Sequence, residues 1–328
     1  MENLDPTVFE LGESVALGRA VSVFRSGDWT LVGSGDDAAV VQTAGKFVVT
    51  TDTMVEGRDF RHEFSSGFDL GFKAVASNFA DVVAMGATPT ALVAALVVTK
   101  TTKQSWLEDF ARGLQAGIDE LAPGAEVVGG DLAQGTEVVI AITAHGELTG
   151  EPILRSGAKP GDLVAVAGTL GKAACGLDLL LSPDPSLAKA HDQFVAVQLR
   201  PSPPLKTGLL ARESASAMLD VSDSLSQDAT RLAAASGVSI KLNSNLMFGY
   251  FAVLEQAAQS MTARGFQASE KEWVLHGGED HALLATFPKD VQIPVGFKVI
   301  GEVLEQSEFP LYLDDAVLES RGWDSVSS

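Results

Sequence analysis

The sequence predicts a two-domain protein of the α/β (α+β) class. Its 328 residues are enough for about two domains, each with its own hydrophobic core. Hydrophobic residues make up 46% of the chain and charged residues 20%, a balance typical of globular proteins. Short apolar runs with strand character alternate along the chain with longer segments of helical periodicity, which indicates packed layers of sheet and helix.

The N-terminal half is expected to form a mixed sheet with helices on one face. Two apolar runs, 38–41 and 47–51, flank the turn Ala44-Gly45 and predict a hairpin. The other elements expected here are helices near 8–21, 68–85 and 105–121, and strands over 91–98, 126–128 and 138–145. Because one face of this sheet would stay apolar and bare, we predict a homodimer through the N-terminal sheet.

The segment 148–152 is the best candidate for a linker, since it is short, polar and contains Gly and Pro. It divides the chain into predicted domains 1–147 and 152–328. The second domain is expected to be an α/β sandwich. Its predicted strands are 163–167, 217–221, 238–242, 298–303, 311–313 and one that runs to 287, with helices between them.

Composition narrows the possible partners. The net charge of −20 argues against binding to nucleic acid or to an anionic membrane, because both require a basic surface. The single cysteine, Cys175, excludes an intrachain disulfide and fits a reducing cytoplasm. The first ten residues lack a signal-peptide pattern, and the longest apolar run, 91–98, is far shorter than a membrane span. We therefore expect a soluble cytoplasmic protein.

Acidic residues gather where strands and helices are expected to begin or end. Asp36 and Asp37 precede the first strand of the predicted hairpin and Asp52 follows the second, so antiparallel pairing would bring three carboxylates together. Such carboxylates repel one another unless they share a cation. The alternative is that Asp is simply common in turns, where its side chain bonds to nearby backbone.

The same pattern recurs later in the chain. The acidic positions at predicted element ends are Asp36, Asp37, Asp52, Asp81, Asp131, Asp220, Asp223, Glu279 and Asp280. Asp81 could instead lie on the wet edge of its helix, and Ser222 with Asp223 could merely cap one. Cysteine ligands are absent and the five histidines lack metal-like spacing, so hard oxygen ligands favour Mg²⁺ over zinc. Metal-assisted phosphoryl transfer is the reaction class that follows.

Seven motifs lie along the chain. They are Gly35-Asp36-Asp37-Ala38-Ala39, Thr50-Thr51-Asp52 with Val55-Glu56-Gly57, Asn78-Phe79-Ala80-Asp81 with Ala84-Met85-Gly86-Ala87, Gly129-Gly130-Asp131, Arg155-Ser156-Gly157-Ala158-Lys159-Pro160-Gly161-Asp162, Asp220-Val221-Ser222-Asp223, and Gly277-Gly278-Glu279-Asp280. In this order they resemble the thiamine-monophosphate kinase family, and they cover almost the whole chain. The resemblance implies the two-domain fold shared with aminoimidazole ribonucleotide synthetase, with an N-terminal domain that binds ATP and Mg²⁺ and forms the dimer.

The resemblance also implies an activity and a site. The γ-phosphate of ATP would be transferred to thiamine monophosphate, giving thiamine diphosphate and ADP, with no general base. Several Mg²⁺ ions would be held by Asp37, Thr50, Thr51, Asp52, Asp81, Asp131, Asp220 and Asp223. ATP would contact Gly130, Asp131, Arg155 and Ser222, and the acceptor substrate would contact Asp59, Glu279 and Trp323.

Alternatives remain at this stage. Arg155 could be only a surface charge, and Trp323 only a plug over the core. The chain could be another ATP-dependent enzyme of the same superfamily, or a noncatalytic sensor of Mg²⁺ or nucleotide. It departs from the family pattern at Ser224, where Gly is common, at His281-Ala282, where Tyr-Glu is common, and at Ser325, where His is common. The first departure concerns the start of a helix and the others concern substrate contacts.

Overall fold

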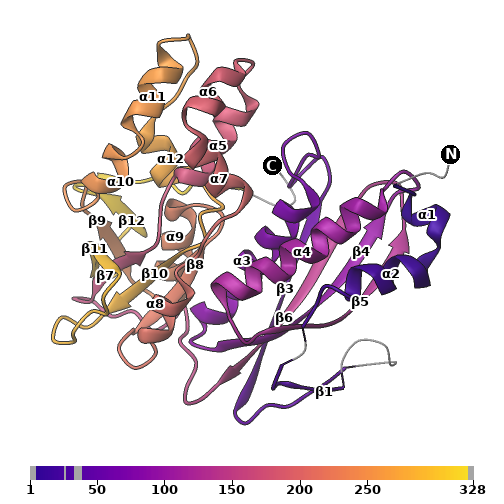
Figure 1. The fold of residues 1–328 in the computed structure, drawn as a ribbon. Coiled ribbons are helices and arrows are strands. Elements are labelled where there is room, and N and C mark those ends of the chain that lie inside the picture. The colour runs from indigo at the N-terminus through magenta and orange to yellow at the C-terminus, as the bar shows by residue number, and fades with distance from the viewer. Residues whose placement is uncertain (1–4, 26, 33–38, 324–328) are drawn as a thin grey trace. The chain divides into compact units, whose positions relative to one another are not determined.

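The computed structural model describes residues 5–25, 27–32 and 39–323. The chain divides into two compact units, one made of residues 1–82 and 87–150, the other of residues 83–86 and 151–328 (Figure 1). Each combines sheet and helices, which confirms the predicted α/β (α+β) class. Within the described residues, none of the helices combines the length and the hydropathy needed to cross a membrane.

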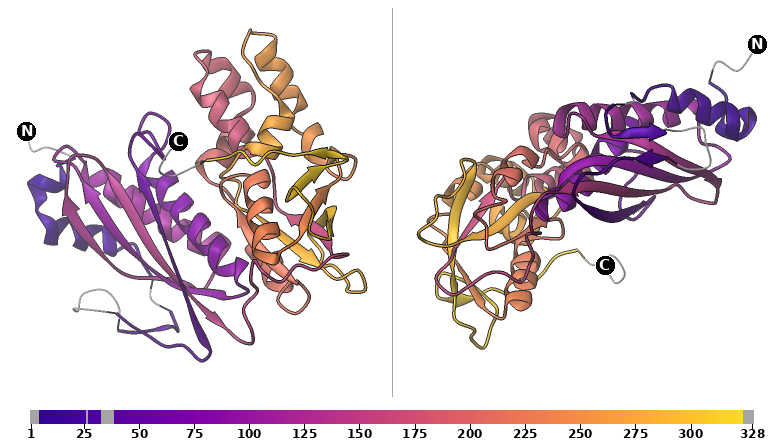
Figure 2. Two further views of the ribbon diagram at one scale, coloured as in Figure 1. Left: turned by 180° about the vertical axis from the view of Figure 1, so that it is seen from behind. Right: turned by 90° about the horizontal axis from the view of Figure 1, so that it is seen from below.

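Unit 1 is a four-stranded mixed sheet with its two long helices on one face (Figure 2, right). Its elements are α1 Val8–Leu11, α2 Glu13–Val21, β1 Thr30–Val32, β2 Val40–Val41, β3 Lys46–Val55, α3 Gly67–Ala84, β4 Thr88–Val98, α4 Gln104–Leu121, β5 Glu126–Gln134 and β6 Val139–Leu148. The strand order is β3-β6-β4-β5, with only β4 and β5 parallel. Alternate residues of β6 are buried, as expected for a sheet covered on one face.

The predicted hairpin is wrong. β2 pairs with β1, whereas β3 pairs with β6 along ten consecutive residues. β3 gains ten cross-strand pairs against β6, more than it could gain against the two-residue strand β2. Asp52 and Asp131 also lie inside strands rather than after them. The single helix expected over 8–21 is two helices, because Gly12 between them has φ +74°.

Helices α3 and α4 cross at unusually close range because glycine faces backbone at the crossing. A Cβ atom at Gly71 would collide with the carbonyl oxygen of Phe110, and one at Gly113 with that of Phe68. The same crossing packs fully buried aromatic and aliphatic side chains against the sheet. Glycine here is therefore required by packing rather than by backbone torsion.

Unit 2 is built on a seven-stranded mixed sheet in the order β13-β12-β9-β11-β7-β10-β8. Its strands are β7 Leu163–Ala167, β8 Ala217–Val221, β9 Ser239–Leu242, β10 Ala282–Phe287, β11 Phe297–Leu304, β12 Leu311–Leu313 and β13 Ala316–Val317. Its helices are α5 Lys172–Leu181, α6 Pro185–Ala190, α7 Asp192–Leu199, α8 Leu205–Leu210, α9 Leu225–Ser236, α10 Phe248–Ala252, α11 Glu255–Thr262 and α12 Glu270–His276. A continuous core joins this sheet to its helices, which confirms the predicted C-terminal α/β layer.

The helix crossing in unit 1 generates a stability prediction. Gly71→Ala and Gly113→Ala should each lower the free energy of unfolding by at least about 1–3 kcal/mol, because the added methyl forces the helices apart. Gly18→Ala is the matched control: it lies in α2, where a Cβ meets nothing within 4 Å, and should add about 0.5–1 kcal/mol. Urea unfolding curves measure all three. Equal effects at the three positions would contradict the close crossing.

Candidate functional site

One group of predicted ligands lies on the helix-covered side of unit 1. Thr50 and Asp52 of β3 pair with Ala144 and Ile142 of β6, both of which are buried beneath the helices. The Thr50 hydroxyl donates a 3.0 Å hydrogen bond to Oδ2 of Asp81 on α3. Residues 31 positions apart in the sequence thus meet, and they present only oxygen atoms.

A second group lies on the open face of the same sheet. Thr51 alternates with Asp52 along β3, so its side chain lies on the opposite side. Asp131 of β5 is also on the open side, because its neighbour across the ladder, Ala95, is exposed there. β3 and β5 are the two edge strands, with about 14 Å between their axes at the usual strand spacing. One sheet therefore does not bring Asp131 to Asp52.

Gly130 precedes Asp131 and is fixed by the tight approach of two strands. It pairs with Ala94 of β4, and a Cβ atom at this position would collide with the Ala94 carbonyl oxygen. The backbone of β5 is exposed at Gly130. A ligand can therefore approach the peptide groups here without a side chain in the way.

Asp59 lies in the turn that follows β3. Its Oδ2 accepts a 2.8 Å hydrogen bond from the backbone N–H of Val55. The neighbouring carboxylate of Glu56 accepts a 2.9 Å hydrogen bond from the N–H of Val138, just before β6. Both acidic side chains thus hold the turn in place at the end of the sheet.

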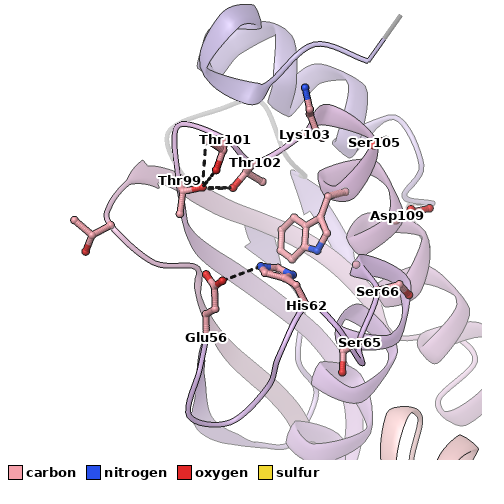
Figure 3. A pocket seen from close by; sticks show the side chains of 13 residues that line it. Glu56, His62, Ser65, Ser66, Thr99, Thr101, Thr102, Lys103, Ser105 and Asp109 are labelled. Carbon is pink, nitrogen blue, oxygen red and sulfur yellow. Dashed lines mark hydrogen bonds and ion pairs between the residues drawn. The ribbon is translucent and has the colours of Figure 1, made fainter. Parts of the chain in front are cut away.

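A cavity of about 640 Å³ opens beside this turn (Figure 3). Glu56 and His62 line one side, and Thr99 and Lys103, at the end of β4 and the start of α4, line the other. Nε2 of His62 lies 3.5 Å from Oε1 of Glu56, and its ring meets that of Trp106 edge-on at 5.7 Å. This cavity could not be predicted from the sequence, because its walls come from loops after two different strands.

In unit 2, the junction between β8 and α9 gathers Asp220, Ser222 and Asp223. Asp220 is only 5% exposed, and Oδ2 of Asp223 accepts a 2.5 Å hydrogen bond from Arg231. The same guanidinium lies 2.7 Å from Asp228. Burial, followed by repulsion from Asp220, raises the pKa of Asp228 to about 6. Sequence reasoning missed Asp228 because an acid in the first turn of a helix is ordinary.

The loop before β10 closes over this junction. The N–H of Glu279 donates a 2.8 Å hydrogen bond to the Ser222 carbonyl oxygen. Nδ1 of His281 lies 3.2 Å from Oδ2 of Asp220, and both side chains are buried. Glu279 and His281 have φ of 66° and 50°, a left-handed backbone that costs energy outside glycine and marks candidate functional loops.

Asp280, between those two residues, is turned into the interior. It accepts a 2.6 Å hydrogen bond from the Thr169 hydroxyl and a 3.2 Å hydrogen bond from the N–H of Ala173, in the first turn of α5. Its carboxyl is completely buried, and this burial raises its pKa. Asp280 therefore fastens the loop to the start of α5 instead of facing a ligand.

Trp323 reaches the same junction from the far end of the chain. Its backbone N–H donates a 3.2 Å hydrogen bond to the carbonyl oxygen of Asp223, and the residue is 39% exposed. Arg155 is exposed, and its carbonyl oxygen accepts a 2.8 Å hydrogen bond from Ser236 at the end of α9. Five of the predicted residues thus converge in unit 2: Asp220, Ser222, Asp223, Glu279 and Trp323.

The hydroxyl and carboxylate oxygens of the predicted ligands are of the type that binds a hard divalent cation. Thr50, Asp52 and Asp81 share one side of unit 1 and offer the ligand type that Mg²⁺ takes. Across residues 5–25, 27–32 and 39–323, no three His, Cys, Asp or Glu side chains are grouped as a metal site. Asp37 lies outside the described residues.

The fold and these acidic junctions define a protein of the AIR synthase related class. The model of the AIR synthase related protein, N-terminal domain, matches residues 35–148. Thiamine-monophosphate kinase of Mycobacterium tuberculosis (strain ATCC 25618 / H37Rv) is 37% identical over 98% of this chain and 93% of that protein. The chain belongs to the thiamine-monophosphate kinase family, which confirms the resemblance in its motifs.

Solved structures agree with this assignment. Thiamine-monophosphate kinase from Stenotrophomonas maltophilia K279a superposes with a TM-score of 0.76 at 28% identity, over 96% of this chain and 99% of that one. AaThiL complexed with AMPPCP and TMP gives 0.74 at 27% identity, over 98% and 100%. The two-domain fold expected from the family resemblance is therefore confirmed.

The environment of Asp280 generates a second prediction. Asp280→Asn replaces one acceptor oxygen by an N–H₂ group that faces existing donors, so it should lower the free energy of unfolding by about 1–3 kcal/mol. Thr169→Val removes one bond only and should cost about 0.5–1.5 kcal/mol. A double-mutant cycle by thermal unfolding should show coupling between them. Additive effects would mean that the two side chains do not interact.

Proposed function

We propose that the chain transfers the γ-phosphate of ATP to thiamine monophosphate, giving thiamine diphosphate and ADP. The single observation that carries this proposal is 37% identity to a thiamine-monophosphate kinase over nearly the whole chain. The fold shared with AaThiL complexed with AMPPCP and TMP supports both substrates. The enzyme would work in the cytoplasm, where ATP is available and where its one cysteine, buried in α5, stays a thiol.

The chemistry asks for positioning rather than for a base. The attacking group is a phosphate oxygen, and the second pKa of a phosphate monoester is about 6, so it is already ionised at neutral pH. What the protein must do is hold two negatively charged phosphate groups end to end. We assign ATP contacts to Gly130, Asp131, Arg155 and Ser222. We assign acceptor contacts to Asp59, Glu279 and Trp323.

Mg²⁺ is the cofactor that best suits the acidic residues. When bound, it neutralises phosphate charge and stabilises the transferring group. Thr50, Asp52 and Asp81 would hold it on the helix side of unit 1, and Thr51 and Asp131 would serve separate positions at opposite edges of the open face. Asp37, Asp220 and Asp223 complete the proposed set. Several ions rather than one follow because Asp52 and Asp131 lie on opposite faces and on opposite edge strands of the sheet.

A homodimer through the open face of unit 1 is part of the proposal. Phe47 and Val49 of β3 stay 52% and 58% exposed on this face. The ring of His145 stacks on Phe47 at 4.9 Å, and its partly buried imidazole has a lowered pKa because of burial. The apolar part of this face, at Phe47 and Val49, is the kind of surface that a second copy of the chain would cover.

The kinase proposal predicts the behaviour of two acidic residues. Purified protein with ATP, Mg²⁺ and thiamine monophosphate should form thiamine diphosphate. Asp52→Asn and Asp220→Asn should each lower kcat by at least about 100-fold, because transition-state charge is left uncompensated, with the fold retained. The matched control is Asp315→Asn, a surface partner of Lys241 with a 94% exposed side chain, which should keep full activity. Near-normal turnover in either site variant would contradict the assigned metal sites.

The dimer is tested separately. Light scattering at micromolar concentration should give twice the 34.3 kDa chain mass. Val49→Asp places a charge on the open face and should shift the protein toward monomer, because an unpaired charge in an apolar interface is costly. Val295→Asp, at an 86% exposed side chain in unit 2, is the control and should leave the mass unchanged. A monomeric mass for the parent protein would refute this proposal.

A further inference from the structure

The last described residues, Arg321 to Trp323, are fastened to the start of α9. The carbonyl oxygen of Arg321 accepts hydrogen bonds from the hydroxyls of Ser224 at 2.6 Å and Ser226 at 2.8 Å. The N–H of Arg321 donates to the Ser226 hydroxyl at 3.2 Å. The backbone N–H and carbonyl oxygen of one residue of the C-terminal segment are thus held by two serines that are 0% exposed.

Two more hydrogen bonds hold the residue that follows. The N–H of Trp323 donates to the carbonyl oxygen of Asp223, and its own carbonyl oxygen accepts from Nε2 of Gln227, each at 3.2 Å. Gly322 lies so close that a Cβ there would be 2.7 Å from both the Asp223 carbonyl oxygen and the Ser224 hydroxyl. The backbone of the segment is therefore fixed in register with residues 223–227.

Ser224 carries two roles with one hydroxyl. It accepts a 3.0 Å hydrogen bond from the N–H of Gln227, as an N-cap does, and donates to Arg321. Its φ of 170° is extended, so the backbone at this position does not require glycine. What Ser224 adds over glycine is the hydroxyl that grips the C-terminal segment.

We propose that Ser224 and Ser226 are positioning residues that hold Trp323 in place to contact the phosphate acceptor. This rests on the proposed kinase function and deepens it. The turn that carries Ser222 and Asp223, assigned to ATP and metal, also holds the backbone of Trp323. A cationic heteroaromatic ring, such as the thiazolium of thiamine monophosphate, would stack on the 39% exposed indole. The two serines would then determine the distance between the Trp323 indole and the phosphate site.

The test separates this role from helix capping. Ser224→Ala with Ser226→Ala should raise KM for thiamine monophosphate about tenfold, through the loss of hydrogen bonds that hold the segment, and leave KM for ATP unchanged. Trp323→Ala should do the same, and adding the two serine changes to it should raise KM no further. Ser269→Ala is the matched control, since Ser269 caps α12 in the same way but has no part in the site.

A second measurement does not depend on turnover. The fluorescence of Trp323, taken as the difference between the parent and Trp323→Phe, should become more accessible to iodide when both serines are replaced. Unchanged accessibility would overturn the proposal. An unchanged KM for thiamine monophosphate in an active double-serine variant would also overturn it. The same holds if the two serine changes raise this KM further in the Trp323→Ala variant. If the parent forms no thiamine diphosphate, the kinase assignment fails, and the iodide result still decides whether the serines position Trp323.

Discussion

The register of β3 against β6 is the constraint on which the arrangement of unit 1 depends. Ten consecutive pairs fix which side chains of β3 face the helices, and a slip of one residue would exchange the two faces. Thr50 and Asp52 face the helix side, because Ala144 and Ile142 opposite them are buried there. Asp81 of α3 lies on the same side. Thr51 faces the other way for the same reason. Polar ligands are thus placed by an apolar pattern on the neighbouring strand.

Unit 2 buries several carboxylates close to the end of β8. Asp220, Asp228 and Asp280 are each at most 5% exposed. Buried carboxylates need charge partners or hydrogen-bond donors to remain in the fold. Arg231 supplies charge to Asp228, the start of α5 supplies donors to Asp280, and His281 lies against Asp220. The raised pKa of Asp228 shows that this compensation is incomplete.

Much of the fold could be predicted because local sequence pattern specifies it. The strands at 163–167 and 217–221 are apolar runs bounded by turn residues, and both occur where expected. The partner of β3 could not be predicted, since β6 lies about 90 residues away and only the sum of ten pairs selects it. The family pattern predicted roles for the acidic residues, but not which of them would meet in unit 2. The left-handed backbone of Glu279 and His281 could not be predicted either, because tertiary contacts impose it on residues that do not favour it.

The departures from the family pattern at Ser224 and His281 have a physical explanation in these contacts, whereas Ser325 lies outside the described residues. With glycine in place of Ser224, the Arg321 carbonyl oxygen would keep one serine donor and the first turn of α9 would lose its side-chain cap. His281, where the family commonly has tyrosine, places its ring Nδ1 3.2 Å from Oδ2 of Asp220. Ser224 adds a hydroxyl that glycine lacks, and His281 places a ring nitrogen next to a buried carboxylate. These two departures therefore change contacts around the proposed site, whereas the proposed acidic ligands match the family motifs.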